Sequence, residues 1–184
     1  MAVPDSVSLR KLSGTFLMNK DLSDDPEAVL SLQGIGWITR KAIRYSSVQL
    51  VITEAEENGV TKITIVQTTT GGIENTEERL LDWEFREKKD SVFGQVNGRA
   101  RWVNISEMTD EWFSQFDQKS LDAAHGEVIH AYTESVGLSG DQWKADQVWA
   151  FETINGERRH TRRIIMTRGD KVLKIRNVYD WKSE

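Results

Sequence analysis

The sequence predicts a mainly β protein, an antiparallel up-and-down β-barrel of nine or ten strands. Short runs rich in β-branched and aromatic residues follow one another, and tight turns join most of them. Asn58-Gly59 and Asn155-Gly156 carry the signature of two-residue hairpins. Strands do not alternate with long helical segments, as they would in a parallel sheet. We expect the meander to close into a barrel, because closure removes exposed sheet edges.

Composition indicates one soluble globular domain over residues 1–184, with 38% hydrophobic and 29% charged residues. No apolar run approaches a membrane span, and the first residues lack the apolar core of a signal peptide. Cysteine is absent, so we expect a cytoplasmic protein without disulfides. The net charge of −5 argues against nucleic acid as a partner.

The N-terminal part predicts an arm, one strand and two short helices. Residues 1–11 form a loose arm, and apolar residues at mostly even spacing follow as the first strand. A helical pair over residues 24–45 comes next, interrupted by Gly34 and Gly36. Helices this short are marginal alone in water, so we expect them to cover the barrel mouth as a lid.

The rest of the chain predicts strands and one inserted helix. Residues 105–125 carry apolar side chains three to five apart, typical of an amphipathic helix capped by Ser106 or Thr109. We expect this helix to pack across the barrel in a monomer; a homodimer interface is the alternative. Segment 76–87 has helix-favouring composition but is interpreted as one or two strands. The remaining strands are expected at 47–53, 61–70, 92–103, 127–136, 143–154, 158–168 and 172–181.

Motifs of conventional catalysis are absent from the sequence. It contains no cysteine, no G-x-S-x-G, no phosphate-binding glycine loop and no H-E-x-x-H. The histidines at 125, 130 and 160 lack the spacing of a metal site. We therefore expect no metal and no cofactor, and a nucleophilic hydrolase or nucleotide enzyme is disfavoured.

Polar side chains on otherwise apolar strands are the candidate catalytic groups. His130 and Tyr132 share one face of their strand, opposite Ile129 and Ala131. If the His130 face lines the cavity, it supplies donors and a proton acceptor. If Ile129 faces inward instead, the polar residues meet water, and both alternatives are open. The candidates for catalysis are His130, Tyr132, Arg101 and Gln67.

Seven tryptophans and a basic run provide candidate ligand contacts. In Arg158–Arg163, alternate residues face opposite sides of a strand, so a solvated sheet face is the ordinary explanation. A pocket-lining arginine is the alternative, and it would need an acceptor such as a ligand carbonyl or carboxylate. The candidates for ligand binding are Trp37, Arg40, Trp83, Gln147, Trp149, Phe151, Arg162 and Tyr179.

Several motifs resemble known families. Gly34 to Lys41 (GIGWITRK) resembles the G-V-G-x-x-x-R-K segment of intracellular fatty-acid-binding proteins, and Gly14-Thr15-Phe16 resembles their G-T-W. The chain more closely resembles a fungal group of lipocalin-like proteins. The motifs that carry this resemblance are LQGIGWITRKAI, TGGIENTEERLLDW, FGQVNGRARW and NVYDW.

This resemblance implies a calycin-type barrel around a ligand cavity. Some members of the fungal group are implicated as pericyclases, cofactor-free enzymes that fold a polyene for cycloaddition. Fatty-acid-binding proteins hold a carboxylate with an R-x-Y pair on the last strand. Here Arg176 and Tyr179 are three residues apart, so an unbulged strand points them to opposite sides.

Two functions follow as hypotheses, and both require a hydrophobic small molecule as partner. The first is a cofactor-free cyclase or isomerase of secondary-metabolite biosynthesis, which needs only a shaped cavity and a few donors. The second is a non-catalytic carrier of a lipid or hydrophobic metabolite. A protein-interaction role for the helix around Trp112 is a weaker third hypothesis.

Overall fold

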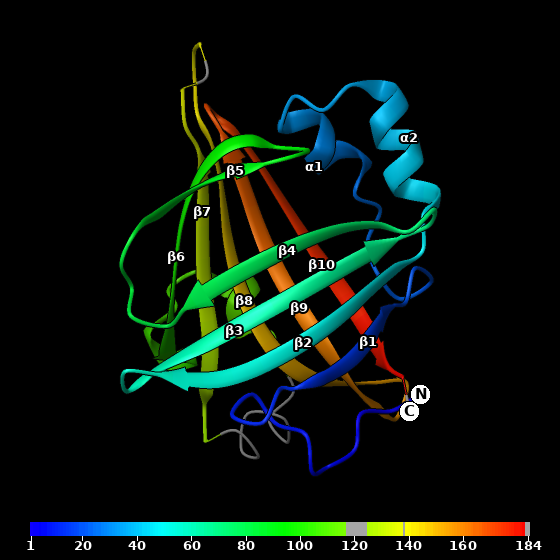
Figure 1. Cartoon of the computed structure of the whole chain (residues 1–184), viewed down its shortest axis with the longest axis vertical. Coiled ribbons are helices and arrows are strands. Elements are labelled where there is room, and N and C mark those ends of the chain that lie inside the picture. Colours follow the sequence, from blue (N-terminus) through cyan, green and yellow to red (C-terminus); the bar gives the residue numbers. More distant parts are fainter. Residues whose placement is uncertain (117–124, 138, 183–184) are drawn as a thin grey trace.

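The structure is a computed structural model, and it describes residues 1–116, 125–137 and 139–182. Ten strands within these residues form one antiparallel sheet that curls around an interior (Figure 1). The strands are β1 (Gly14–Met18), β2 (Val48–Glu57), β3 (Val60–Thr69), β4 (Ile73–Leu80), β5 (Arg86–Asp90), β6 (Gly94–Asn104), β7 (Glu127–Ser135), β8 (Trp143–Ile154), β9 (Glu157–Arg168) and β10 (Lys171–Trp181). The antiparallel barrel fold is thus confirmed, and the segment 76–87 contributes to two strands.

The sheet is open between β4 and β5. Its order is β4-β3-β2-β1-β10-β9-β8-β7-β6-β5, and no ladder within the described ranges joins the two outer strands. The expected removal of both edges is therefore wrong. Side chains cross the gap instead: Lys88 Nζ donates to Thr76 O at 2.5 Å, and Asn75 Nδ2 donates to Asp90 Oδ2 at 3.1 Å. Both edge strands are rich in charge, which protects exposed edges from pairing with other chains.

The N-terminal arm closes one end of the barrel, beside both termini (Figure 1). Val3, Val7 and Leu9 are buried against the inward side chains of the sheet. The sequence predicted a loose arm. This prediction is wrong, because the apolar residues of the arm complete the core. The inward strand residues of this core are Phe16, Leu50, Ile52, Ile63, Ile65, Ala100, Ile129, Ala131, Trp149, Phe151 and Tyr179.

The two N-terminal helices lie at the opposite end of the barrel (Figure 1), and their function as a lid over a ligand stays a prediction. Helix α1 (Glu27–Leu32) packs Val29 and Leu32 onto a cluster from β6, β8, β9 and β10. Helix α2 (Trp37–Tyr45) buries none of its residues. Arg40 joins the helices, because it pairs with Glu27 of α1 at 2.7 Å and donates to Ile35 O at 2.6 Å.

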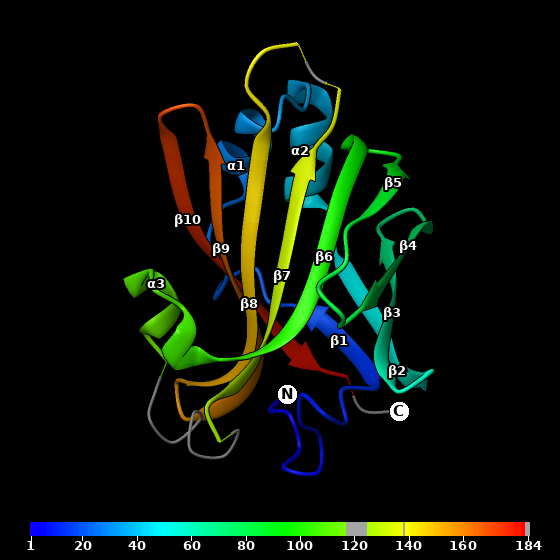
Figure 2. The ribbon, with the colours of Figure 1, turned by 90° about the vertical axis from the view of Figure 1, so that its left-hand side faces the viewer.

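The inserted segment differs from the expected single helix over residues 105–125. The described part contains a 3₁₀ helix, Ile105–Glu107, and a separate short helix α3, Glu111–Ser114. Asp110 is extended and its carboxylate accepts from Trp112 N, so a new helix begins there. Residues 117–124 of the prediction lie outside the described part. Phe113 packs on the outer face of the sheet, where Figure 2 shows α3 beside β8.

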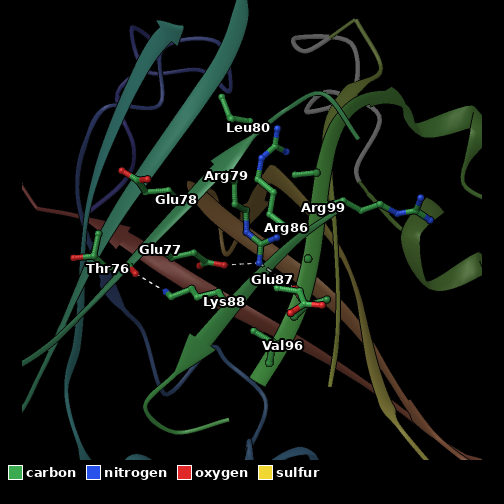
Figure 3. A pocket seen from close by; sticks show the side chains of 13 residues that line it. Thr76, Glu77, Glu78, Arg79, Leu80, Arg86, Glu87, Lys88, Val96 and Arg99 are labelled. Carbon is green, nitrogen blue, oxygen red and sulfur yellow. Dashed lines mark hydrogen bonds and ion pairs between the residues drawn. The ribbon is translucent and has the colours of Figure 1, made fainter. Parts of the chain in front are cut away.

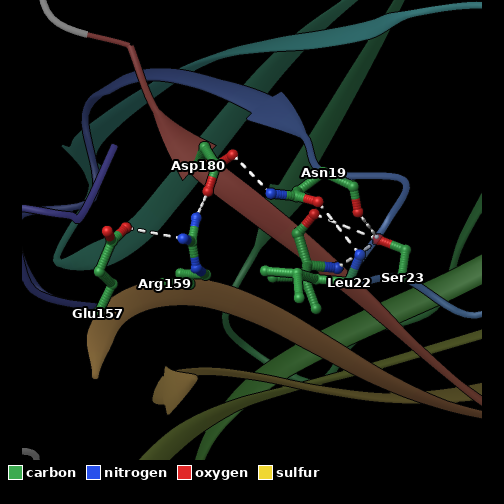
Figure 4. Close-up of polar contacts among 7 residues, drawn as sticks. Asn19, Leu22, Ser23, Glu157, Arg159 and Asp180 are labelled. Atoms are coloured by element: carbon green, nitrogen blue, oxygen red, sulfur yellow. Dashed lines mark hydrogen bonds and ion pairs between the residues drawn. The ribbon is translucent and has the colours of Figure 1, made fainter. Parts of the chain in front are cut away.

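The arginine-rich strand β9 is buried on both faces, so the expected solvated face is wrong. Outward Arg163 donates to Glu152 Oε1 at 2.6 Å and to the carbonyl oxygen of Gln115 at 2.7 Å. Outward Arg159 is clasped by Glu157 and Asp180, as Figure 4 shows. The inserted segment and the ion-pair partners cover charges that a bare strand would expose to water.

None of the helices in the described ranges combines the length and apolar character needed to cross a bilayer.

Candidate functional site: a polar cluster inside the barrel

The gap between β4 and β5 leads into a cavity of about 410 Å³ (Figure 3). This volume falls in the range of small-molecule sites in proteins. Inward residues of β6 and β7, among them Ala100 and Thr133, form part of the wall, while charged residues of β4 and β5 surround the opening. The cavity is lined by Thr76, Glu77, Glu78, Arg79, Leu80, Arg86, Glu87, Lys88, Val96, Gly98, Arg99, Ala100 and Thr133.

Two guanidinium groups of the interior lie near the ring of Trp149. Its ring centroid is 4.0 Å from the Arg162 guanidinium carbon and 5.8 Å from that of Arg79. Arg79 also pairs with Glu77 and donates to Thr133 Oγ1 at 3.2 Å. Within the described ranges, the side-chain hydrogen bond of Arg162 is to His160, with 3.4 Å between Nε and Nε2. The interior therefore combines an aromatic surface with strong donors.

Burial and neighbouring charges set the protonation of this cluster. Burial raises the pKa of the Glu77 carboxyl, but Arg79, Arg162 and Lys88 together bring it below its ordinary value. Burial lowers the pKa of the His160 imidazole well below its usual value, and Arg162 lowers it further. Glu77 is therefore charged and His160 neutral at pH 7.

Five residues predicted to bind a ligand lie on the inward faces of the three adjacent strands β8, β9 and β10. Trp149 Nε1 donates to Gln147 Oε1 at 3.2 Å, so the Gln147 amide nitrogen remains a donor on the same face. Trp149 is paired across the ladder with Arg162, whose guanidinium lies 5.4 Å from the Tyr179 ring centroid. Phe151 lies on the same inward face, against His160. The predicted part of these residues in ligand binding stays a prediction, because none of them is among the residues that line the cavity.

His130, Tyr132 and Arg101 lie on the outer face of the sheet, because Ile129 and Ala131 face inward. The sequence left open which face of this strand points inward. In the structure Ile129 and Ala131 face the core, and the polar residues face outward. Yet His130 is buried, since Trp83 stacks on it at 4.7 Å between ring centroids. Their predicted part in catalysis stays a prediction. Gln67, the fourth candidate, follows Ile65 on the inward face of β3.

This outer cluster is held by charge and aromatic contacts. His130 Nε2 lies 2.5 Å from Asp146 Oδ1, and Nδ1 accepts from Arg101 Nε at 3.4 Å. Burial and the hydrogen bond to Glu134 raise the pKa of the Tyr132 hydroxyl. Trp83, predicted as a cavity residue, belongs to this cluster with a positive φ of 64°. It fixes the β4–β5 connection to the barrel wall.

The two predicted lid residues have different positions. Trp37 has 62% of its surface exposed, with Lys41 Nζ 5.4 Å from the ring centroid. Arg40 holds α2 to α1 through Glu27 and so has a structural role in the lid. The opposite orientation of Arg176 and Tyr179 is confirmed: Arg176 Nη1 lies 3.7 Å from Glu152 on the outer face, and Tyr179 is in the core.

Glu77 and Arg79 are the interior residues that sequence reasoning missed. They belong to TEERLL, whose composition also suits a helix and obscured the two-residue period. The signal was present, because Leu81 continues the same alternation and is buried in the core.

Comparison with solved structures identifies the class of fold. Caenorhabditis elegans lipid binding protein 8 has a TM-score of 0.59 at 14% identity, covering 96% of this chain and 99% of that chain. A Schistosoma mansoni fatty acid binding protein in complex with arachidonic acid has a TM-score of 0.55 at 18% identity, covering 96% and 100%. The chain therefore has the fold of the fatty-acid-binding, calycin-type barrels.

Comparison with curated sequences identifies the family. Pericyclase pydY of Acremonium sp is 29% identical over 184 residues, covering 98% of this chain and 97% of the relative. Probable pericyclase scpY of Mollisia scopiformis is 31% identical over 183 residues, covering 98% and 94%. No general family model matches the chain. The chain belongs to the lipocalin-like family that contains these two proteins, as the sequence motifs suggested.

Proposed function

We propose that this protein is a cofactor-free pericyclase of secondary-metabolite biosynthesis, which folds a hydrophobic polyene inside its barrel and accelerates its cyclisation. The observation that carries the proposal is the set of donors around the aromatic ring of Trp149 inside the barrel. The relationship to two pericyclases over nearly the whole chain supports the same reaction class.

The reaction places modest demands on the protein. In a cycloaddition two π bonds are consumed as two carbon–carbon σ bonds form, so no atom, proton or electron enters or leaves. Holding the chain folded, with its reacting carbons in contact, removes much of the entropic barrier. The walls that restrict the chain in this proposal are the aromatic rings of Trp149, Phe151 and Tyr179.

A donor on a conjugated carbonyl lowers the barrier further by stabilising charge that develops in the transition state. Arg162 and the Gln147 amide lie beside Trp149 and are the proposed donors. Gln67, inward on β3, is the proposed third polar contact. The outer-face residues His130, Tyr132 and Arg101 act in this proposal only by fixing the wall and the β4–β5 connection.

The test begins with the small molecules that co-purify with the protein. They are extracted from denatured protein, separated by liquid chromatography with mass spectrometry, and incubated with fresh native or boiled protein. Because the reaction conserves atoms, we expect a product of identical mass and different retention time, formed only with native protein. Recovery of polyenes that native protein leaves unchanged would support the carrier hypothesis and contradict the pericyclase.

Variants then connect the reaction to the interior. Gln147→Leu keeps the side-chain volume but removes the donor, and we expect conversion to slow by about tenfold or more. Trp37→Ala is the matched control on the exposed face of α2, and we expect its rate to equal that of the wild type. Equal rates in both variants would contradict the placement of the reaction near Trp149.

A further inference from the structure

We propose that the ligand is a hydrophobic acid, a carboxylic acid or an acidic enol, whose anionic oxygens bind between Arg79 and Arg162 beside Trp149. The inference deepens the proposed function, because it rests on ligand binding inside the barrel. It concerns the chemical class of the ligand and is independent of whether the ligand is transformed.

The first argument is the unbalanced charge of this part of the interior. Arg79 and Arg162 supply two positive charges, and Glu77 supplies one negative charge. Glu77 forms its ion pair with Arg79, whereas no carboxylate of the described residues lies within ion-pair distance of Arg162. A buried guanidinium without a counter-ion is costly, and an anionic ligand would offset that cost.

The second argument is the hydrogen bonding of the two guanidinium groups. Arg162 is only 8% exposed, and its Nη2 atom has no hydrogen-bond partner in the part of the chain that the structure describes. The Nε atom of Arg79 likewise has none there. Buried N–H donors of this kind are nearly always satisfied in proteins, and carboxylate-type oxygens match their geometry best.

The third argument is how firmly these donors are held. Arg162 stacks on Trp149 at 4.0 Å and lies near the Tyr179 ring, so its guanidinium is fixed before a ligand arrives. Arg79 is on β4 at the wall of the cavity, next to the opening between β4 and β5. Arg162 does not line this cavity, but its guanidinium and that of Arg79 lie 4.0 Å and 5.8 Å from the Trp149 ring centroid. An acid that enters by this opening would therefore meet Arg79 first.

The test compares cis-parinaric acid, a fluorescent polyene acid, with its uncharged methyl ester. We expect the wild type to bind the acid at least about tenfold more tightly, since a charged hydrogen-bonded contact is worth that ratio. Arg162→Met removes the charge and keeps most of the volume. We expect it to lose the preference for the acid while it binds the ester as the wild type does.

Matched variants separate charge from folding. Arg176→Met lies on the neighbouring strand but faces outward, so we expect it to keep the full preference for the acid. If circular dichroism shows that Arg162→Met is unfolded, Arg79→Met is tested in its place. We expect its preference for the acid over the ester to be at least about threefold smaller than that of the wild type.

The outcomes distinguish this inference from the proposed function. Equal binding of acid and ester by the wild type overturns the anion site and leaves a barrel that binds neutral ligands. A preference that survives in the folded Arg162 variant overturns the assignment to this arginine. Binding of neither probe overturns the anion site and the ligand-binding barrel together.

Discussion

Individual buried polar residues have protonation states and contacts that can be tested, and His160 is the first of them. His160 has no exposed surface and lies among Phe16, Phe151 and Tyr179, with ring centroids 5.3 to 5.6 Å away. Its Nδ1 atom lies 3.2 Å from the carbonyl oxygen of Ala150. The imidazole therefore acts as a neutral aromatic core group beside the Arg162 donor.

The depressed pKa of His160 predicts a pH-dependent stability. The folded pKa lies below the unfolded value of 6.5, so only the unfolded chain takes up this proton as the pH falls below about 6.5. The stabilising contribution is complete above that pH and is lost below it, by up to about 1.4 kcal/mol per pH unit. Urea unfolding at pH 7.5, 6.5 and 5.5 should show a steeper loss for the wild type than for His160→Gln. Parallel curves would contradict the buried neutral imidazole.

The outward pair of Arg163 and Glu152 predicts a large stability effect. Both side chains are only 5% exposed, so Glu152→Ala leaves a guanidinium buried without its carboxylate. We expect the free energy of unfolding to fall by about 3 to 5 kcal/mol. Lys174→Ala, which removes an exposed ion pair with Asp110, should cost less than about 1 kcal/mol. Similar losses of unfolding free energy in both variants would show that the inserted segment does not cover Arg163 and Glu152 in solution.

Single elements explain where the sequence could predict the site and where it could not. The hairpin turns and the two-residue periods placed the strands β8, β9 and β10 and grouped their residues by face, but for β9 and β10 they did not show which face points inward. The predicted ligand contacts of Gln147, Trp149 and Arg162 stay predictions. The period alone could not choose between the faces of β7, because both carry apolar residues. The choice depends on what packs outside, where Phe113 and Phe116 cover one part and Trp83 another.

Gly14 in strand β1 provides a test of close packing. A Cβ atom there would lie 2.2 Å from Trp181 Cη2, and φ is +153°. We expect Gly14→Ser to lower the free energy of unfolding by about 1 to 3 kcal/mol in thermal or urea unfolding, because the core cannot accommodate added atoms. Gly36→Ser, where a Cβ atom meets nothing within 4 Å, should change stability by less than about 0.5 kcal/mol.

Substitutions on helix α2 and on strand β8 are predicted to differ in their effect on ligand affinity. Trp37 on α2 is mostly exposed, so Trp37→Ala should change the affinity for parinaric acid methyl ester by less than about twofold. Trp149→Phe removes an indole surface from the interior and should weaken that affinity by about tenfold. Fluorescence titration measures both. A reversed order would mean that the ligand binds beneath the lid helices and away from β8.

The whole molecule is a curled sheet closed at both ends and open at one side. The N-terminal arm fills one end, α1 covers the other, and the charged strands β4 and β5 border the side opening. The strand meander was evident from the sequence, because turns and two-residue periods are local signals. The opening was not, because a missing ladder between β4 and β5 depends on the curvature of all ten strands. The same global geometry brings Arg79 of β4 near Arg162 of β9.

A crystal structure of the protein in complex with cis-parinaric acid tests the central claim most directly. We predict polyene density inside the barrel against Trp149, with the carboxylate oxygens between Arg79 and Arg162. Density on the outer face instead, against Trp83 and His130, would contradict the account.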